Sequence, residues 1–206
     1  MATLTYRLRV AAPKDADALR AVYAPFVEQT AISFEYDVPD TAEFARRVES
    51  TLQRYPYLLA EDAHGTVLGY ACTHTFLPRA AYDRCAETTI YLSSPAQRGG
   101  LGRAFYGALE ELSRAQGICN LYACIGEPEG AADEYLGYNS IRFHERMGYR
   151  RIGVFTRCGY KFGRWYNIVW AEKLLSSHAA QPQPFVPFPQ LDGALVADIL
   201  RKYSTF

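Results

Sequence analysis

Hydrophobic residues in the N-terminal part of the chain follow two different spacings. In residues 6–10 every second residue is apolar, and this period of two predicts a β-strand. Apolar residues then recur every three or four positions in 15–26 and again in 41–52, which predicts two amphipathic helices. This part of the chain is therefore expected to run strand, helix, helix.

The next segments return to strand-like patterns. Two apolar stretches, 57–60 and 66–76, flank the turn-forming pair His64-Gly65, so we expect a β-hairpin there. A third strand is expected at 88–92.

Helices and strands alternate in the second half of the chain. The pattern predicts helices over 101–116 and 140–147 and strands over 119–125, 149–154 and 165–172. The whole order is one strand, two helices, three strands, helix, strand, helix and two strands. This succession predicts an α/β fold.

The composition changes after Leu175. Four prolines lie among apolar residues, and Asp192 is placed to cap a last short helix with apolar residues on one face. We therefore expect one domain over 1–175 and a proline-rich arm over 176–206. An arm that packs on its own domain and an arm that embraces a partner subunit both fit this pattern.

Length and charge narrow the class of protein. The chain has 206 residues, of which 49% are hydrophobic, and this is enough for a substantial core in one domain. Its 22 lysines and arginines balance 22 aspartates and glutamates, so no overall field favours nucleic acid or an anionic membrane as a partner. No apolar run approaches the length of a membrane span, and residues 1–10 lack the apolar core of a signal peptide. We expect a cytoplasmic protein.

The cysteines indicate neither a metal site nor a disulfide framework. They are odd in number, lie mostly in apolar segments and show no Cys-x-x-Cys spacing. Buried free thiols are therefore expected at Cys72, Cys85, Cys119, Cys124 and Cys158.

The most informative local feature is a glycine-rich turn between an expected strand and an expected helix. Gly99, Gly100 and Gly102 have no Cβ atoms to block close approach to the backbone, and the N–H groups that open a helix attract anions. Arg98 and Arg103 add positive charge on either side. The turn is predicted to bind phosphate; a glycine turn with a purely structural role is the alternative.

Three phosphate-binding motifs compete for this turn. A P-loop needs a Lys-Ser/Thr pair where the chain has Arg103, and a dinucleotide fingerprint needs a small residue where it has Phe105. The remaining pattern, Gln-x-x-Gly-x-Gly at Gln97, Gly100 and Gly102, resembles the acetyl-CoA pyrophosphate loop of the GNAT superfamily of N-acetyltransferases. The resemblance implies that acetyl-CoA is the cofactor and that its site comprises Ile90, Tyr91, Leu92, Gln97, Arg98, Gly99, Gly100, Leu101, Gly102 and Arg103.

Acyl transfer to an amine needs a base that removes a proton from the nitrogen. Glu87 is the first candidate, because it shares one face of the expected strand with Thr89 and Tyr91 and projects toward the acyl end of the cofactor. A solvated glutamate at the start of a strand is the alternative.

Three ordered blocks extend the resemblance to one branch of the superfamily. Residues 82–91 are similar to the Tyr-Asp-x-x-x-Glu-Ser/Thr-Thr-x-Tyr block of phosphinothricin and methionine-sulfone N-acetyltransferases, and 143–149 and 158–166 match two later blocks. The resemblance covers roughly 6–173. It implies the GNAT fold, with a mixed sheet splayed open where acetyl-CoA enters, a homodimer, and Glu87 as the general base.

His144 stands immediately before a Glu-x-x-Gly-Tyr block, at a position where this branch has a histidine implicated in catalysis. Imidazole titrates near neutrality and is able to relay a proton in either direction. A core histidine facing the sheet is the alternative. If the parallel holds, Glu87 and His144 are the catalytic pair.

The same resemblance indicates the acceptor side. Phe34, Arg79 and Tyr82 fall where the family places segments near the acceptor pocket, and an arginine there suits a carboxylate; an exposed loop arginine without a substrate role is the alternative at Arg79. Glu35 departs from this pattern, because its charge disfavours an anionic amino-acid analogue if it faces inward. An acidic insertion at 129–136 is a second departure and is expected to reshape the mouth of the pocket.

The sequence therefore favours an acetyl-CoA-dependent N-acetyltransferase that acts on the amine of a small molecule, such as an amino-acid analogue. A peptide or protein amine acetyltransferase is the alternative among enzymes, and the acidic insertion would suit a basic peptide. From another class comes a non-catalytic acyl-CoA-binding module. The presence of both Glu87 and His144 argues against that module, because a sensor needs only the phosphate loop.

Overall fold

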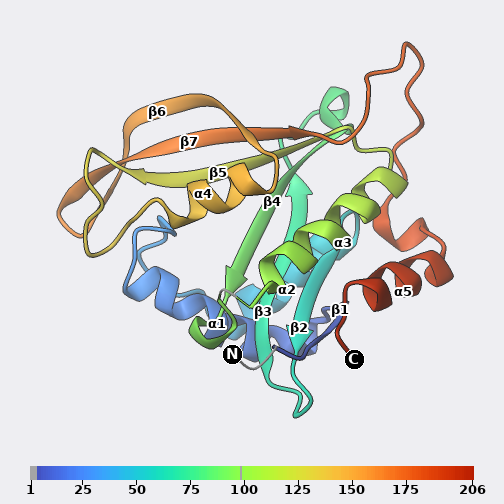
Figure 1. Ribbon diagram of the computed structural model, residues 1–206, viewed down its shortest axis with the longest axis horizontal. Helices are drawn as coiled ribbons and strands as arrows, with labels where there is room; N and C mark the ends of the chain where they lie inside the picture. The colour runs from blue at the N-terminus through green and yellow to red at the C-terminus, as the bar shows by residue number, and fades with distance from the viewer. Residues whose placement is uncertain (1–3, 98) are drawn as a thin grey trace.

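The computed structural model describes residues 4–97 and 99–206 and is built around one seven-stranded sheet (Figure 1). Neighbouring strands run antiparallel, except β4 and β5, which are parallel. The predicted mixed sheet and the predicted order of elements are confirmed. Along the sheet the strands are β1 (Arg7–Val10), β2 (Tyr57–Glu61), β3 (Val67–Thr75), β4 (Cys85–Leu92), β5 (Asn120–Pro128), β7 (Arg164–Leu174) and β6 (Arg150–Lys161).

The sheet opens at the parallel pair. The register of β4 with β5 covers three residue pairs, from Cys85 opposite Asn120 to Glu87 opposite Tyr122. Beyond Glu87 the two strands diverge, and β5, β7 and β6 fan away from β1–β4 (Figure 1). The backbone of β4 beyond Glu87 thus faces β5 across an opening instead of bonding to it.

Helices cover both faces of the sheet. α1 (Ala16–Glu28) and α2 (Thr41–Leu52) pack on one face through apolar side chains at the predicted helical spacing. α3 (Leu101–Ala115), α4 (Asn139–Arg146) and α5 (Gly193–Lys202) pack on the other face. Within residues 4–97 and 99–206, no helix combines the length and the apolar character needed to cross a bilayer.

Three strands extend well beyond the ranges that the hydrophobic pattern predicts; one of them, β5, continues to Pro128 instead of ending at 125. β4 begins at Cys85 instead of 88, because the polar Glu87 interrupts the apolar alternation at its start. β6 continues to Lys161 instead of ending at 154, because its register with β7 shifts between Arg151 and Gly153 and again farther along. Such irregularities break the period of two by which a strand is recognised.

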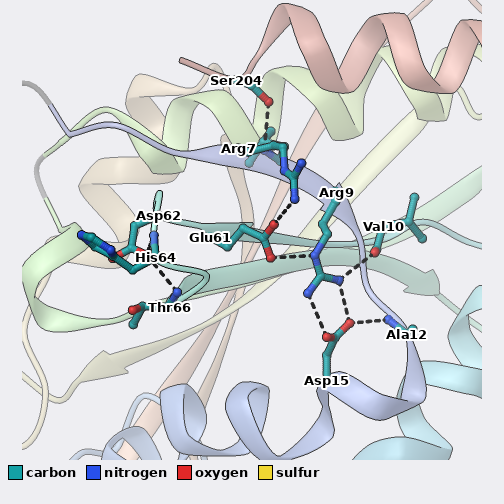
Figure 2. A network of polar contacts seen from close by, with 11 residues as sticks. Arg7, Arg9, Val10, Ala12, Asp15, Glu61, Asp62, His64, Thr66 and Ser204 are labelled. Atoms are coloured by element: carbon teal, nitrogen blue, oxygen red, sulfur yellow. Dashed lines mark hydrogen bonds and ion pairs between the residues drawn. The ribbon is translucent and has the colours of Figure 1, made fainter. Parts of the chain in front are cut away.

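An ion-pair network fastens β1 to β2 and to the turn that precedes α1 (Figure 2). Arg9 binds Asp15 at 2.7 and 2.8 Å and Glu61 at 2.8 Å, and Arg7 is a second partner of Glu61. The hydrogen bonds from Arg9 hold the pKa of Asp15 below its usual value. Since β1 is an edge strand, this network lies away from the opening between β4 and β5.

The C-terminal arm packs against its own chain. Phe188, Ile199 and Leu200 are buried in the core that α3 also covers. The two ends of the described chain meet, because the Thr205 N–H donates to the Tyr6 carbonyl at 2.8 Å. Contacts within one chain therefore account for these buried residues of the arm.

All five cysteines carry free thiols, as predicted. Cys72 and Cys119 are buried and Cys85 is half-buried, but Cys124 and Cys158 are exposed, so the prediction of burial is wrong at these two positions. Cys124 lies on β5 beyond the point where β4 diverges, and Cys158 lies in the irregular part of the edge strand β6.

Candidate active site

Glu87 lies where β4 and β5 part. Its neighbours in the sheet are His74 on β3 and Tyr122 on β5, and the pair with Tyr122 is the last before the strands diverge. Because residues alternate along a strand, its side chain shares the α1–α2 face of the sheet with those of Thr89 and Tyr91. The carboxylate therefore stands at the apex of the opening.

Burial sets the proton affinity of this carboxylate. Glu87 is half-buried, and burial raises its pKa to about 7. The Nε2 atom of His74 is 4.0 Å from Oε1 of Glu87 and 3.2 Å from the Thr89 hydroxyl, and burial lowers the pKa of His74. A carboxylate with a pKa near neutrality is able to accept a proton and release it again within one turnover.

An aromatic group lies beside this carboxylate; sequence reasoning named its member Tyr82 as an acceptor residue but missed Phe76, Tyr122 and Trp170. Phe76 stacks on Tyr122 with ring centroids 4.1 Å apart, and Trp170 and Tyr82 meet Phe76 edge-on at 5.5 and 6.0 Å. The sequence could have indicated His74 and Phe76, because the two residues are two positions apart in the expected strand over 66–76 and therefore share one face of it. The position of Tyr122 and Trp170 depends on strand register, which a single sequence does not show.

The glycine turn forms the N-terminus of α3. Gly100 is the N-cap residue, with a left-handed φ of +85°, and a Cβ atom at this position would meet open space. A Cβ on Gly102 would instead come within 3.0 Å of the Phe143 ring, so this glycine also permits the packing of α3 on α4. By helix geometry the N–H groups of Leu101 and Gly102 have no acceptor within α3. The turn thus offers backbone donors and the positive end of a helix to an anion.

Polar side chains flank the turn. Arg103 is exposed in the first turn of α3, and the Gln97 side chain donates to the Leu92 carbonyl at 3.3 Å. Arg98, the other arginine of the predicted site, lies outside the described residues.

A cleft of about 60 Å³ lies between the diverging strands. The ring of Tyr91 packs on Tyr23 of α1 at 4.8 Å, on the α1–α2 face of the sheet. Of the predicted cofactor residues on this strand, Ile90 and Tyr91 line the cleft. The full lining is Ile32, Thr88, Thr89, Ile90, Tyr91, Cys124, Ile125, Gly126, Leu136, Ser140 and His144.

His144 lines the same cleft from α4, on the other face of the sheet from Glu87. Its Nδ1 is 2.8 Å from the Ser140 carbonyl and its Nε2 is 2.7 Å from the Tyr106 hydroxyl. These partners indicate that Nδ1 carries the proton and that Nε2 accepts one from tyrosine. Burial lowers the pKa of His144 to about 4, so the ring is neutral at physiological pH.

The predicted acceptor residues fall into separate clusters. Tyr82 joins the aromatic group beside Glu87 through Phe76. Phe34 lies in the loop after α1, and its ring is so close to Gly159 of β6 that a Cβ there would fall 2.0 Å from it. Arg79 is exposed at the start of the short helical turn Ala80–Tyr82.

The charge of Glu35 is compensated within the protein. Arg47 of α2 binds this carboxylate at 2.7 Å, and the Tyr23 hydroxyl donates to it at 3.0 Å. The side chain is therefore held toward α1 and α2, and its negative charge is paired.

The acidic insertion is fastened to the β6–β7 hairpin. Glu129 pairs with Arg157 at 2.7 Å, and Asp133 and Glu134 pair with Arg164 at 3.2 and 2.8 Å. Each acidic side chain of the 129–136 segment thus has a cation of the same chain beside it.

Fold and opening together define a class of protein. The sheet is mixed, it splays at a short parallel pair, an anion-binding helix start borders the opening, and a half-buried carboxylate stands at its apex. This is the architecture of a transferase that binds a phosphate-bearing co-substrate between two strands.

Comparison with known proteins gives the family. The family described as acetyltransferase (GNAT) domain matches residues 8–170. The chain is 31% identical to the phosphinothricin N-acetyltransferase of Streptomyces viridochromogenes, over 89% of the chain and 95% of that protein. It is 30% identical to the L-methionine sulfoximine/L-methionine sulfone acetyltransferase of Pseudomonas aeruginosa, over 85% of the chain and 98% of that protein.

A solved structure agrees with this result. The crystal structure of a phosphinothricin acetyltransferase from Sinorhizobium meliloti in complex with acetyl-CoA has a TM-score of 0.77 at 28% identity, covering 90% of this chain and 99% of that one. The chain belongs to the GNAT family of acetyltransferases. It is an N-acetyltransferase, and acetyl-CoA is its co-substrate.

Proposed function

We propose that the chain transfers the acetyl group of acetyl-CoA to the amine of a small molecule, such as an amino-acid analogue, by direct attack of the amine on the thioester. The observation that carries this proposal is the half-buried Glu87 at the apex of the opening, with a pKa of about 7. The names of two relatives, a phosphinothricin and a methionine sulfone acetyltransferase, support this class of acceptor.

Glu87 acts as the general base. An alkyl ammonium group with a pKa of ~10.4 is only about one part in a thousand neutral near pH 7.4, so its deprotonation costs on the order of 4 kcal/mol. Glu87 accepts this proton directly or through a water molecule, and the neutral nitrogen attacks the thioester carbonyl. As the tetrahedral intermediate collapses, the carbon–sulfur bond breaks and the second proton of the nitrogen passes to the leaving thiolate. A positioned base typically contributes about 10²- to 10⁴-fold in rate.

The start of α3 binds the pyrophosphate of the co-substrate. The N–H groups of Leu101 and Gly102 and the side chain of Arg103 provide donors and positive charge, and Gly100 leaves room for the phosphates. The backbone of β4 beyond Glu87, which no longer bonds to β5, is suited to pair with the amide groups of the pantetheine arm.

His144 relays a proton at the thioester. The ring is neutral at physiological pH and holds no proton of its own to give. Its Nε2 exchanges the Tyr106 hydroxyl for the second proton of the nitrogen, released as the tetrahedral intermediate collapses, and passes that proton to the leaving thiolate. The competing interpretation is a core histidine whose partners are Tyr106 and Ser140.

The variants His144→Phe and His144→Asn separate these two roles. Both variants remove the hydrogen bond to the buried Tyr106 hydroxyl. Each should therefore lower the free energy of unfolding by about 1–3 kcal/mol, and the melting temperature should fall with it. A relay predicts in addition that turnover per folded enzyme falls at least about tenfold in both. A folded His144→Phe enzyme with wild-type turnover would remove His144 from the mechanism.

Charge pairing in the insertion disfavours the peptide alternative. Because Arg157 binds Glu129 and Arg164 binds both Asp133 and Glu134, the two arginines leave this segment with one uncompensated negative charge and a weaker attraction for a basic peptide than its sequence indicates. Thiol release from acetyl-CoA, measured with amino-acid analogues, simple amines and basic peptides, tests the proposal. We expect turnover with at least one small amine. Turnover with peptides alone would contradict the proposed acceptor class, and CoA binding without any turnover would indicate a binding module.

We further propose that the protein is a cytoplasmic homodimer. The edge strand β6 exposes Ile152 and Phe155 at 46% and 58%, and an apolar edge strand is a typical pairing surface. Five free thiols suit a reducing compartment. Sedimentation equilibrium should give the mass of two chains, and the mass of one chain at all concentrations would contradict the dimer.

A further inference from the structure

Lys161 is a buried lysine whose hydrogen-bond partners are backbone carbonyls. It ends β6 with 3% of its surface exposed, and its Nζ donates to the carbonyl oxygens of Val27 at 2.7 Å, Thr30 at 3.0 Å and Ser33 at 2.7 Å. An ammonium group has three N–H donors, and all three are used. Burial lowers the pKa of Lys161, but the negative C-terminal end of α1, where Val27 lies, favours its charge.

The turn after Lys161 has a strained backbone. Phe162 has a φ of +52°, a left-handed conformation that an L-residue adopts only at a steric cost. Its ring stacks on Tyr135 with centroids 4.3 Å apart and an interplanar angle of 16°. The turn therefore directs two consecutive side chains to two different segments, Lys161 to 27–33 and Phe162 to 129–136.

These two segments meet over the cleft. The Ala31 N–H donates to the Tyr135 carbonyl at 3.0 Å, and Ile32 from the first segment and Leu136 from the second both line the cleft between β4 and β5. Together they form its roof.

The first segment also connects to the catalytic strand. The Ser33 hydroxyl is 2.5 Å from the Tyr23 hydroxyl, and the Tyr23 ring contacts Tyr91 of β4 at 4.8 Å. Phe34, the predicted wall of the acceptor pocket, follows Ser33 directly. A displacement of Ser33 would therefore change both the roof and the acceptor wall.

The geometry points to Lys161 as a positioning residue for the acceptor: by holding the carbonyls of 27–33, its ammonium group fixes the roof of the cleft over the reacting amine. The inference rests on the proposed function, because it concerns the acceptor side of the same cleft. Lys161 touches no reacting atom and acts through the backbone that it binds.

The variant Lys161→Met tests this role, because methionine keeps much of the apolar stem and removes all three donors. We expect the KM for the acceptor amine to rise about fivefold or more, with a CoA Kd that changes less than about twofold. Hydrogen exchange at the Ala31 amide should accelerate, because its bond to Tyr135 loses support.

Two further variants make the test decisive. Lys173→Met removes a lysine that binds Glu110 and the Met147 carbonyl, so it should lower stability and leave the acceptor KM unchanged. Phe162→Gly relieves the strained φ and removes the stack on Tyr135. This variant should fold even if Lys161→Met does not. It should still raise the acceptor KM, because Tyr135 belongs to the second segment of the roof.

Wild-type acceptor KM and wild-type exchange at Ala31 in the folded variants Lys161→Met and Phe162→Gly would overturn the inference. If Lys161→Met does not fold, Lys161→Gln, which keeps two N–H donors but no charge, decides by the same KM and exchange measurements. A wild-type enzyme that acetylates no amine would contradict the proposed function instead, and exchange at Ala31 would then decide the role of Lys161.

Discussion

Replacing Glu87 with glutamine should lower turnover by about 10²- to 10³-fold at neutral pH and leave the Kd of CoA nearly unchanged. Glutamine has the shape of glutamate but accepts no proton from the ammonium group. The cofactor site is expected to stay intact, because the glycine turn lies beyond the far end of β4. Steady-state turnover and calorimetry of CoA binding on the same preparation check both parts.

The same variant should be more stable than the wild type at alkaline pH. Burial raises the pKa of Glu87 from its ordinary 4.5 to about 7 in the folded protein. Because the pKa of Glu87 is higher in the folded than in the unfolded protein, the protonated carboxyl favours the folded state. This contribution to the free energy of unfolding is fully present below pH 4.5 and is lost as the pH rises through about 7. Ionised Glu87 therefore destabilises the fold by up to about 3 kcal/mol, which glutamine avoids.

Glu61→Gln is the matched control. Glu61 binds Arg7 and Arg9 in the network of Figure 2, away from the opening, so its replacement should lower the melting temperature and leave turnover unchanged. Glu87→Gln should thus lose turnover without losing stability, whereas Glu61→Gln should lose stability without losing turnover. Unchanged turnover in Glu87→Gln would exclude Glu87 as the base.

Valine at Gly100 should weaken CoA binding about 100-fold or more, through the loss of several charge-assisted hydrogen bonds. A side chain at this position meets open space in the protein, so it would occupy the region in front of the N–H groups of Leu101 and Gly102 where the pyrophosphate binds. Gly102→Val is a poorer test, because its side chain would also press on Phe143.

Gly65→Val controls for backbone strain. Gly65 has a φ of +82°, close to the +85° of Gly100, and it too faces open space, but it lies in the β2–β3 turn. Both variants should lose similar stability, and Gly100→Val alone should lose CoA affinity in calorimetry. A folded Gly100→Val protein with wild-type CoA affinity would contradict the assignment of this turn.

The hydrophobic pattern was sufficient for the order of elements because each helix and most strands bury one face. The glycine turn and Glu87 were predictable for a related reason, since each belongs to a continuous segment whose local chemistry is visible in the sequence. β6 was predicted too short, because the register shifts beyond Arg151 break the alternation that marks a strand.

Contacts between distant segments were not predictable from one sequence. His74 and Tyr122 come beside Glu87 only through the register of three strands. Glu35 reads as a free charge until its pair with Arg47 is seen, and the acidic insertion reads as a free acidic surface until its arginine partners are known. Long-range pairing decides whether such a charge acts on a substrate or on the protein itself.

The pH dependence of kcat/KM for the acceptor amine, measured side by side for the wild type and Glu87→Gln, tests the central claim most directly. If Glu87 is the base, the wild-type profile has a limb that falls below a pH of about 7, where this carboxyl becomes protonated, in addition to the limb that the amine contributes. The limb near 7 should be missing from the Glu87→Gln profile. The same limb in both enzymes, or its absence from the wild type, would contradict the assignment of Glu87 as the base of acetyl transfer.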